Sequence, residues 1–332
     1  MHEPSLPSAP CFSDVLDAAD RIAGVANQTP LLNFKVLDEE VGGRVFLKAE
    51  SLQRTGSFKF RGAFNRLSMI SPEKKALGVV ACSSGNHAQG IALAARLLGV
   101  SAKIVVPADA PEVKKRRTAA DGAEIILYDR ENEDREEIAE ALCKESGATF
   151  VHPYNDPGVI SGQGTSALEA TDQLAKLGLT ADNYLVCTGG GGLTAGSAIA
   201  IQAKSPATNF FTVEPEGFDD HARSFVSGRR EKNAQAGGSI CDALMAPTPG
   251  SLSFPINQSV VEEGLVVSEQ DAMQAVAFAF RELKLVVEPG GAVALAALLS
   301  GKIDAKGQTS TAVLSGGNID AETMMKCLDT CT

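Results

Sequence analysis

Short apolar runs alternate with stretches of helical periodicity along almost the whole chain, and this alternation limits the folds that the chain can adopt. Strand-like runs separated by helix-length segments are typical of an α/β protein with a mainly parallel sheet. No segment of the sequence repeats at a fixed period, and no low-complexity tract interrupts the pattern. The sequence therefore predicts an α/β fold.

The predicted elements follow one another with few gaps. The pattern predicts strands at residues 44–48, 79–82, 103–106, 124–127, 184–187, 210–213 and 311–314. It predicts helices at residues 14–23, 59–67, 87–98, 113–120, 133–144, 166–176, 193–203, 269–283 and 291–299. Residues 229–255 break the rhythm with glycines and prolines, which indicates either a long ordered loop or a mobile flap.

Net charge and cysteine spacing argue against several classes of function. The 332 residues carry a net charge of −11, so nucleic acid is not an expected partner. The seven cysteines lack CxxC or Cys/His ligand spacing, which is typical of reduced cytoplasmic thiols. The N-terminus lacks a signal pattern, and Glu288, Pro289 and glycines interrupt the apolar run 286–299. We therefore expect a cytoplasmic protein without a membrane span.

A lysine between two aromatic residues is the first candidate for chemistry. Lys59 lies between Phe58 and Phe60 in the segment 57–63. Apolar neighbours lower the pKa of a lysine, and its neutral amine forms a Schiff base with an aldehyde. Arg61 leaves an alternative open, because the segment is also compatible with an ordinary basic helix start.

Three further segments follow predicted strands. Gly189-Gly190-Gly191-Gly192 opens a helix; its N–H groups can close on an anion and the helix dipole adds positive charge, which fits a monophosphate. Ser83-Ser84-Gly85-Asn86-His87 offers backbone donors that suit the α-carboxylate of an amino acid. Ser315-Gly316-Gly317-Asn318 ends the last predicted strand. The alternative for the glycine loop and the last segment is an ordinary turn without a ligand.

In this order and at these separations, the four segments resemble those of the fold-type II pyridoxal-phosphate enzymes, whose architecture is tryptophan synthase β-like. The resemblance runs from about residue 12 to about residue 321, and the nearest branch is the group of serine/threonine dehydratases, serine racemases and hydroxyaspartate dehydratases. It implies two open, mainly parallel, three-layer αβα domains with the active site in the cleft between them. Residues 1–75 plus 160–332 would form the large cofactor-binding domain, and residues 76–159 the small domain.

The resemblance also implies roles for individual residues. Lys59 would hold pyridoxal 5'-phosphate and act as the base at Cα. Ser84 would be a second base on the opposite face, or would only cap the helix or bind carboxylate. Asn86 would contact the phenolic oxygen of the cofactor, and Ser315 its pyridine nitrogen. The implied cofactor-binding residues are Phe58, Lys59, Asn86, Gly189, Gly190, Gly191, Gly192, Leu193 and Ser315.

The same resemblance implies a substrate site beside the cofactor. The implied substrate-binding residues are Ser83, Ser84, Gly85, Asn86, His87 and Arg135. We interpret His87 as a packing and hydrogen-bonding residue rather than a general base. Arg135 lies among acidic residues near a predicted helix start, where surface i,i+4 ion pairs are one interpretation. In racemase-like relatives the matching arginine approaches the substrate pocket, which would make a second substrate carboxylate plausible, as in 3-hydroxyaspartate.

An acidic segment, Glu214-Pro215-Glu216-Gly217-Phe218-Asp219-Asp220, follows the predicted strand 210–213. Hard oxygen ligands of this kind suit Mg²⁺ or Ca²⁺. The resemblance to racemases and related dehydratases implies that Glu214, Asp220 and the carbonyl of Phe218 coordinate Mg²⁺, Ca²⁺ or Mn²⁺. The alternative is an exposed acidic loop without a metal.

The implied activity is that of a pyridoxal-phosphate-dependent dehydratase, an ammonia-lyase that converts a β-hydroxy-α-amino acid into a 2-oxo acid and ammonia. L-Threonine and L-serine are the default substrates, and 3-hydroxyaspartate dehydration or serine racemisation are alternatives within the group. A β-replacement synthase is the alternative from a different class. Ala243 departs from the glycine that racemases and biodegradative threonine dehydratases typically have, which leaves the specificity open. A homodimer is expected by analogy.

Overall fold

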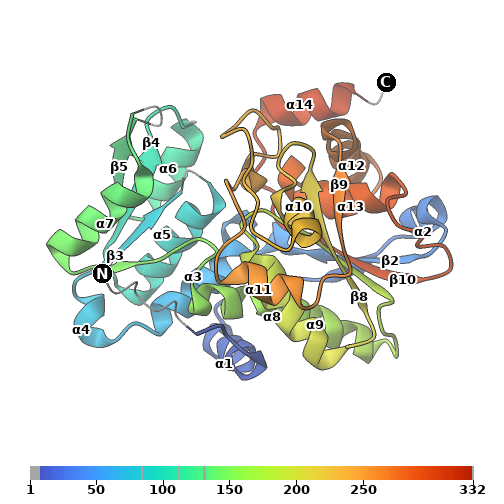
Figure 1. Cartoon of the computed structure of the whole chain (residues 1–332), viewed down its shortest axis with the longest axis horizontal. Helices are drawn as coiled ribbons and strands as arrows, with labels where there is room; N and C mark the ends of the chain where they lie inside the picture. Colours follow the sequence, from blue (N-terminus) through green and yellow to red (C-terminus); the bar gives the residue numbers. More distant parts are fainter. Residues whose placement is uncertain (1–7, 84, 111, 130–131, 331–332) are drawn as a thin grey trace.

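The strands of the protein form two separate sheets (Figure 1). The computed structural model describes residues 8–83, 85–110, 112–129 and 132–330. In spatial order, the larger sheet consists of β1 (Leu31–Asn33), β2 (Arg44–Ala49), β10 (Thr309–Leu314), β7 (Asn183–Cys187), β8 (Asn209–Pro215) and β9 (Glu263–Val267). The smaller sheet consists of β5 (Glu124–Tyr128), β4 (Ala102–Pro107), β3 (Val79–Cys82) and β6 (Thr149–Phe150).

Parallel pairing dominates the large sheet, and both of its faces are buried. β1 pairs antiparallel with β2, and the other neighbouring strands pair in parallel. Along β7, Leu185 and Cys187 join the apolar core on one face, whereas Tyr184 and Val186 join the core on the other. Successive side chains of a strand point to opposite faces, so a strand buried on both faces is a continuous apolar run in the sequence.

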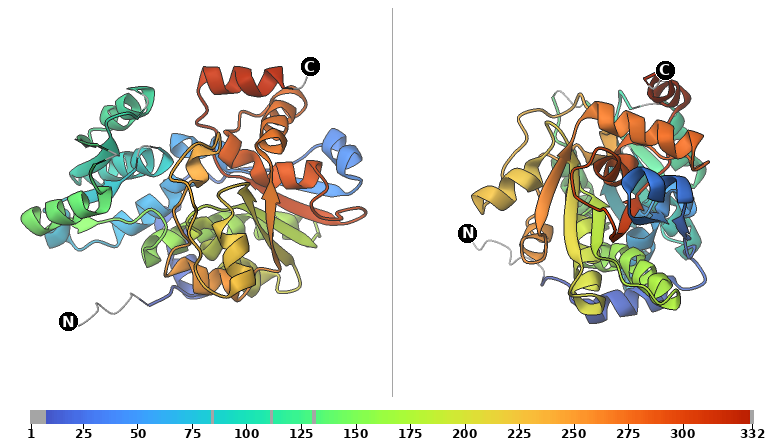
Figure 2. Two further views of the ribbon diagram at one scale, coloured as in Figure 1. Left: turned by 45° about the horizontal axis from the view of Figure 1, so that its top comes forward. Right: turned by 90° about the vertical axis from the view of Figure 1, so that its right-hand side faces the viewer.

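Helices cover both faces of the large sheet and give it three layers (Figure 2). One face packs against α2 (Lys35–Val41), α12 (Glu269–Arg281), α13 (Pro289–Leu299) and α14 (Ala321–Asp329). The other face packs against α1 (Phe12–Ile22), α8 (Pro157–Lys176), α9 (Gly192–Lys204) and α11 (Ser253–Gln258). Local signals set the helix starts: the Asp156 carboxylate accepts from Val159 N at the start of α8, and Ser268 with Asp271 forms a capping box at α12.

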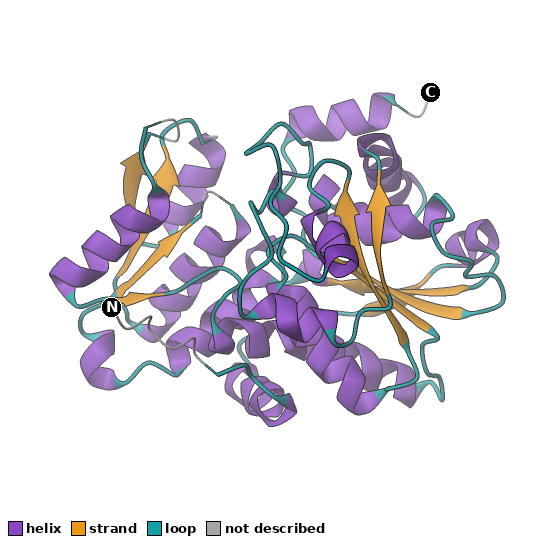
Figure 3. Cartoon of the chain, viewed as in Figure 1, coloured by secondary structure: helices purple, strands orange, loops and turns teal. Residues whose placement is uncertain are grey.

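The small sheet is parallel throughout and is also covered on both faces (Figure 3). Val79 and Ala81 of β3 belong to a core that includes α5 (Asn86–Leu98), and α6 (Glu112–Ala120) lies beside α5. Val80 and Cys82 face the opposite core, which α7 (Arg135–Ser146) covers. The two sheets and their helices agree with the predicted two-domain α/β arrangement. The boundaries at residues 76 and 159 stay a prediction.

Helix α3 (Lys59–Ser68) lies at the junction of the two sheets. Its apolar residues, including Phe60 and Phe64, join the core of the small sheet. Its opposite side meets α8 so closely that a Cβ on Gly162 would lie 2.6 Å from the Cα of Gly62. The first turn of α3 therefore has contacts with both halves of the molecule.

Buried ion pairs hold the start of α3. The fully buried guanidinium of Arg61 binds Glu50 through Nε (2.8 Å) and Nη2 (2.9 Å). It also binds Glu169 of α8 through Nη1 (2.7 Å) and Nη2 (2.8 Å), and Lys48 Nζ lies 2.8 Å from Glu169 Oε2. Bidentate pairs fix direction as well as distance, so the Arg61 side chain orients the turn that carries Lys59. The basic residue noted in the sequence is thus buried and paired.

All predicted strands are present in the structure, with small differences at their ends. The pattern missed the short strands β1, β6 and β9 and the helices α2, α4 (Pro72–Lys75), α10 (Asp220–Ser227), α11 and α14. It also placed the start of α8 at residue 166 instead of Pro157, because glycines at 158, 162 and 164 lower the helix propensity that close packing then overrides. No helix among the described residues is long and apolar enough to cross a membrane.

Candidate active site

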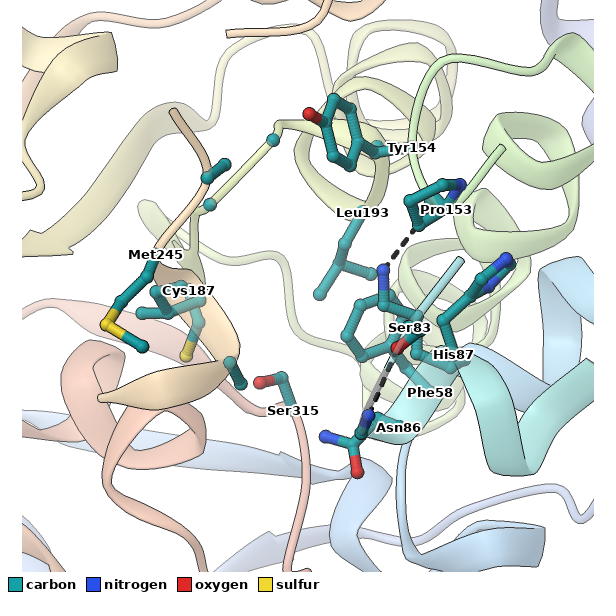
Figure 4. A pocket seen from close by; sticks show the side chains of 18 of the residues that line it. Phe58, Ser83, Asn86, His87, Pro153, Tyr154, Cys187, Leu193, Met245 and Ser315 are labelled. Atoms are coloured by element: carbon teal, nitrogen blue, oxygen red, sulfur yellow. Dashed lines mark hydrogen bonds between the residues drawn. The ribbon is translucent and has the colours of Figure 1, made fainter. Parts of the chain in front are cut away.

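A single cavity of about 180 Å³ gathers the segments predicted from the sequence, and Figure 4 shows its walls. It contains every predicted cofactor-binding and substrate-binding residue except Ser84, which lies outside the described residues. The lining residues are Phe58, Lys59, Cys82, Ser83, Gly85, Asn86, His87, Arg135, Pro153, Tyr154, Cys187, Gly189, Gly190, Gly191, Gly192, Leu193, Thr194, Asp242, Ala243, Leu244, Met245, Ala246, Glu288 and Ser315.

Lys59 enters this cavity from the first residue of α3. Its Nζ donates to the carbonyl of Pro153 (3.0 Å) and lies 5.1 Å from the centroid of the Phe58 ring. Burial lowers the pKa of Lys59 to about 8. The backbone N–H of Phe58 donates to the carbonyl of Ser315 (3.1 Å), which ties the start of α3 to the end of β10. An amine with a lowered pKa and Ser315 therefore line the same cavity.

The four-glycine loop joins β7 to α9 and faces the cavity. In the described part of the chain, the backbone N–H groups of residues 189–194 donate no hydrogen bond, although the Gly191 carbonyl already accepts from Ala195 N (2.8 Å). Gly191 has a φ of +87°, which favours glycine. Unpaired donors at the start of a thirteen-residue helix form a site for an anion. A phosphate group fits this donor set.

The start of α5 supplies a second group of backbone donors. The N–H groups of Asn86 and His87 donate no hydrogen bond to any described residue. The Asn86 side chain is held from both ends: its Nδ2 donates to Glu288 Oε1 (2.6 Å), and its Oδ1 accepts from Asn318 Nδ2 (2.7 Å). The second amide hydrogen of Asn86 is then available to the cavity. The segment 83–87 thus has the donors that a carboxylate requires.

His87 is positioned for packing rather than for proton transfer. Its Nε2 lies 3.1 Å from the carbonyl of Val151, and the ring is almost completely buried. Burial, together with the nearby charge of Lys59, lowers the pKa of His87 to about 3. Burial likewise lowers the pKa of the neighbouring His152 to about 4. Both rings are therefore neutral at physiological pH, in agreement with the interpretation made from the sequence.

The cavity also contains residues that the sequence analysis did not single out as site residues. Figure 4 shows Cys187 and Met245 across the cavity from Phe58 and His87, and Tyr154 beside the glycine loop. A Cβ on Gly190 would lie 2.3 Å from carbons of the Tyr154 ring. No local pattern marks Tyr154 and Met245, because they reach the cavity from segments that are distant from the glycine loop in the sequence, whereas Cys187 ends β7 just before that loop.

Arg135 is the first residue of α7, and its half-buried side chain lines the cavity. None of the described residues forms an ion pair or hydrogen bond with its guanidinium. The backbone carbonyl of Arg135 accepts from Cys82 Sγ (3.0 Å), which joins α7 to the end of β3. The i,i+4 interpretation of Arg135 stays untested, because its acidic neighbour at that spacing, Glu131, lies outside the described residues. Its charge is available to a ligand in the cavity.

The acidic segment forms a separate buried cluster of Glu214, Asp220 and His221. His221 Nδ1 lies 3.5 Å from Glu214 Oε1 and 3.8 Å from Asp220 Oδ2. Burial raises the pKa of Glu214 to about 8 and, together with the charge of Glu214, that of Asp220 to about 7. Asp220 Oδ2 and His221 Nδ1 have no hydrogen-bond partner in the described part. Glu214 and Asp220 are buried rather than exposed, and His221 is a member of the cluster that the sequence analysis missed.

Residues 242–246 bring part of the long segment 229–255 to the cavity. They include the 3-10 helix Asp242–Leu244. Ala243, the residue that departs from the family pattern, lines the cavity. A Cβ added to Gly290 would lie 3.3 Å from the Cβ of Ala243. The departure therefore lies where it can affect the shape of the site.

Comparison with known proteins gives the chain a consistent set of relatives. The family described as "Pyridoxal-phosphate dependent enzyme" matches residues 22–316. The L-threo-3-hydroxyaspartate ammonia-lyase of Pseudomonas sp is 44% identical over 94% of this chain and 96% of that protein. The serine racemase of Schizosaccharomyces pombe is 39% identical over 94% of this chain and 95% of that protein. The solved structure of the threonine deaminase of T.th. has a TM-score of 0.88 at 42% identity, and the match covers 94% of this chain and 99% of that one.

Proposed function

Since the chain belongs to the pyridoxal-phosphate dependent enzymes, we propose that it is an ammonia-lyase that prefers 3-hydroxyaspartate among the β-hydroxy-α-amino acids. The β-hydroxyl leaves as water, and a water molecule then hydrolyses the resulting 2-imino acid, so the net products are a 2-oxo acid and ammonia. Pyridoxal phosphate is the cofactor that the family implies. The unpaired N–H groups of residues 189–194 and the amine of Lys59 fit its phosphate and its aldehyde.

Bound pyridoxal phosphate would supply an electron-withdrawing ring that stabilises negative charge at the substrate Cα. The glycine loop would bind the phosphate, and the hydroxyl of Ser315 would face the ring nitrogen. Lys59 would hold the aldehyde and, once displaced by the substrate amine, would take the proton from Cα. Its lowered pKa suits this role because a base works best near the operating pH.

The start of α5 would orient the substrate. The N–H groups of Asn86 and His87 would bind the α-carboxylate together with Ser83 and Gly85, since all four line the cavity. His87 would keep its neutral ring in the wall and take no proton. Ser84 would serve as a second base on the opposite face of Cα, a role for which the described residues give no geometry.

The single observation that favours 3-hydroxyaspartate is the guanidinium of Arg135. It lines the cavity with Lys59 and lacks a carboxylate partner among the described residues. A half-buried cation without a counter-ion is costly, and guanidinium matches a carboxylate through paired hydrogen bonds. The β-carboxylate of 3-hydroxyaspartate would supply that partner, whereas threonine and serine have no second carboxylate.

Steady-state kinetics of ammonia release test this preference. For Arg135→Met, we expect kcat/KM for L-threo-3-hydroxyaspartate to fall about 10- to 100-fold, the cost of a lost charged hydrogen bond, while kcat/KM for L-threonine stays within about twofold. The exposed Arg116 of α6 offers a matched control, because Arg116→Met removes a guanidinium that does not line the cavity. Equal losses on both substrates would contradict the proposed role of Arg135.

Assays of the same purified enzyme distinguish the lyase from the two other activities considered in the sequence analysis, serine racemisation and β-replacement. Chiral chromatography after incubation with L-serine would reveal racemisation, and Ser84→Ala should abolish D-serine formation if Ser84 is the second base. Cysteine formed from sulfide and an activated serine would identify a β-replacement synthase. Ammonia release without either product assigns the lyase.

We also propose that the cluster of Glu214, Asp220 and His221 binds a divalent cation, with the Phe218 carbonyl as a further ligand. The unpartnered Asp220 Oδ2 and the buried carboxylates support this proposal, because a cation would offset the cost of burying negative charge. Mg²⁺, Ca²⁺ and Mn²⁺ all accept such oxygen ligands. A cytoplasmic location and a homodimer stay predictions from the sequence and the resemblance.

A further inference from the structure

Two carbonyl groups of the glycine loop, those of Gly190 and Gly191, point toward α11 and the turn before it. The Gly190 carbonyl accepts from Ser253 Oγ (2.8 Å) and from Gly250 N (3.1 Å). Asn257 Nδ2 lies 3.4 Å from the Gly191 carbonyl and donates to it. Ser253 and Asn257 are one turn apart on α11, and both are completely buried. One short helix thus contacts two successive carbonyl groups of the loop.

Peptide geometry converts these contacts into a direction for the N–H groups. In a trans peptide the C=O and the following N–H point in opposite directions. When Ser253 and Gly250 hold the Gly190 carbonyl, the N–H of Gly191 must point away from α11. A glycine peptide can otherwise rotate at little cost, because glycine populates both signs of φ.

The glycine loop also packs closely against α11 and His221. A Cβ on Gly191 would lie 2.6 Å from His221 Nε2, 2.8 Å from Asn257 Nδ2 and 2.9 Å from Ser253 Oγ. Asn257 Nδ2 lies 3.3 Å from His221 Nε2, so the Asn257 amide bridges the loop and the buried cluster. The unpaired N–H groups of Gly191 and Gly192, which follow these two carbonyls, are therefore available on the side away from α11.

We propose that Ser253 and Asn257 are positioning residues for phosphate recognition. Ser253 fixes the Gly190–Gly191 peptide with its N–H toward the cavity, and Asn257 supports the next peptide. Neither side chain lines the cavity, so they act through the backbone of the loop. This inference rests on the proposed function only in taking the phosphate of pyridoxal phosphate as the anion.

Binding of two probes to the apoenzyme tests the role of Ser253. Pyridoxal phosphate and pyridoxal differ only in the phosphate. The ratio of their dissociation constants therefore measures how much the glycine loop contributes to phosphate binding. For Ser253→Ala, we expect pyridoxal phosphate to bind about tenfold more weakly, the effect of one lost buried hydrogen bond, while pyridoxal binds as in the wild type. The phosphorus NMR shift of the bound cofactor should move as well. Asn257→Leu should give a smaller change of the same kind.

The controls separate this inference from a general loss of stability. Ser259 donates to the Ile256 carbonyl (2.7 Å) from an exposed position at the end of α11, so Ser259→Ala should leave the ratio unchanged. If Ser253→Ala does not fold, Ser253→Cys keeps the size with a weaker donor. Equal weakening of both probes, or a wild-type ratio in the folded variants, would overturn the role of Ser253. A wild-type enzyme that binds both probes equally would instead contradict the cofactor site itself.

Discussion

The amine of Lys59 carries the clearest pH dependence at the scale of single residues. Burial lowers its pKa to about 8, and only the neutral amine attacks an aldehyde. The rate at which apoenzyme attaches pyridoxal phosphate should therefore rise with pH through a midpoint near 8 and level off above it. Stopped-flow absorbance measures this rate, and borohydride trapping with peptide mapping identifies the attached residue. A midpoint near 10, the value for an exposed lysine, would contradict the desolvated environment.

A substitution of Asp220 tests the proposed cation site. Titration with Mn²⁺, followed by electron paramagnetic resonance of the free ion, should reveal a site in the wild type. Asp220→Asn should weaken it about tenfold or more, because the site loses a charged ligand. Glu216 lies on the same segment but is exposed, so Glu216→Gln should bind Mn²⁺ like the wild type. Unchanged binding in Asp220→Asn would place the ion elsewhere.

At the scale of elements, the loop between β7 and α9 depends on its lack of side chains. A Cβ on Gly190 would overlap the Tyr154 ring at 2.3 Å, so Gly190→Ala must displace the ring or the loop. We expect this variant to bind pyridoxal phosphate at least about tenfold more weakly, as measured by equilibrium dialysis. Gly237→Ala is the matched control, because a Cβ at Gly237 meets nothing within 4 Å and its φ is not positive. Equal affinities of Gly190→Ala and the wild type for pyridoxal phosphate would show that the Tyr154 ring moves aside at little cost.

The elements that the sequence pattern missed share a physical reason. β6 and α11 are too short for a hydrophobic period to stand out, and their stability comes from the neighbours against which they pack. The first turns of α8 are rich in glycine, which propensity disfavours but close contact with α3 requires. In α11 this matters for function, since Ser253 and Asn257 lie on a helix that periodicity did not predict.

At the scale of the whole molecule, the cofactor would join both halves. The cavity is lined by Lys59 of α3, by Asn86 of α5 next to the small sheet, and by the glycine loop that follows β7 of the large sheet. A ligand that binds only the folded state stabilises it by mass action. Removal of pyridoxal phosphate should therefore lower the melting temperature by about 3–8 °C, and re-addition should restore it. Scanning calorimetry of both forms checks this, and identical melting curves would argue against a cofactor held by both halves.

The chain's own pattern was sufficient for the α/β class, and the resemblance of its local segments to a known family indicated the family and most of the residues around the cavity. The four glycines and the segment 83–87 each lie between a predicted strand and a predicted helix, and Lys59 begins a predicted helix. The ammonia-lyase class, which the comparisons confirm, followed from the resemblance of these segments to a known family.

Tertiary structure alone decided which distant groups complete the site. Glu288 reaches Asn86 across 202 positions of sequence, and Ser253 reaches Gly190 across 63. It also decided that the half-buried Arg135 lines the cavity, and that Glu214 and Asp220 are buried beside His221. Burial and hydrogen-bond partners depend on how helices pack on the two sheets, and neither leaves a periodic trace in the residues concerned.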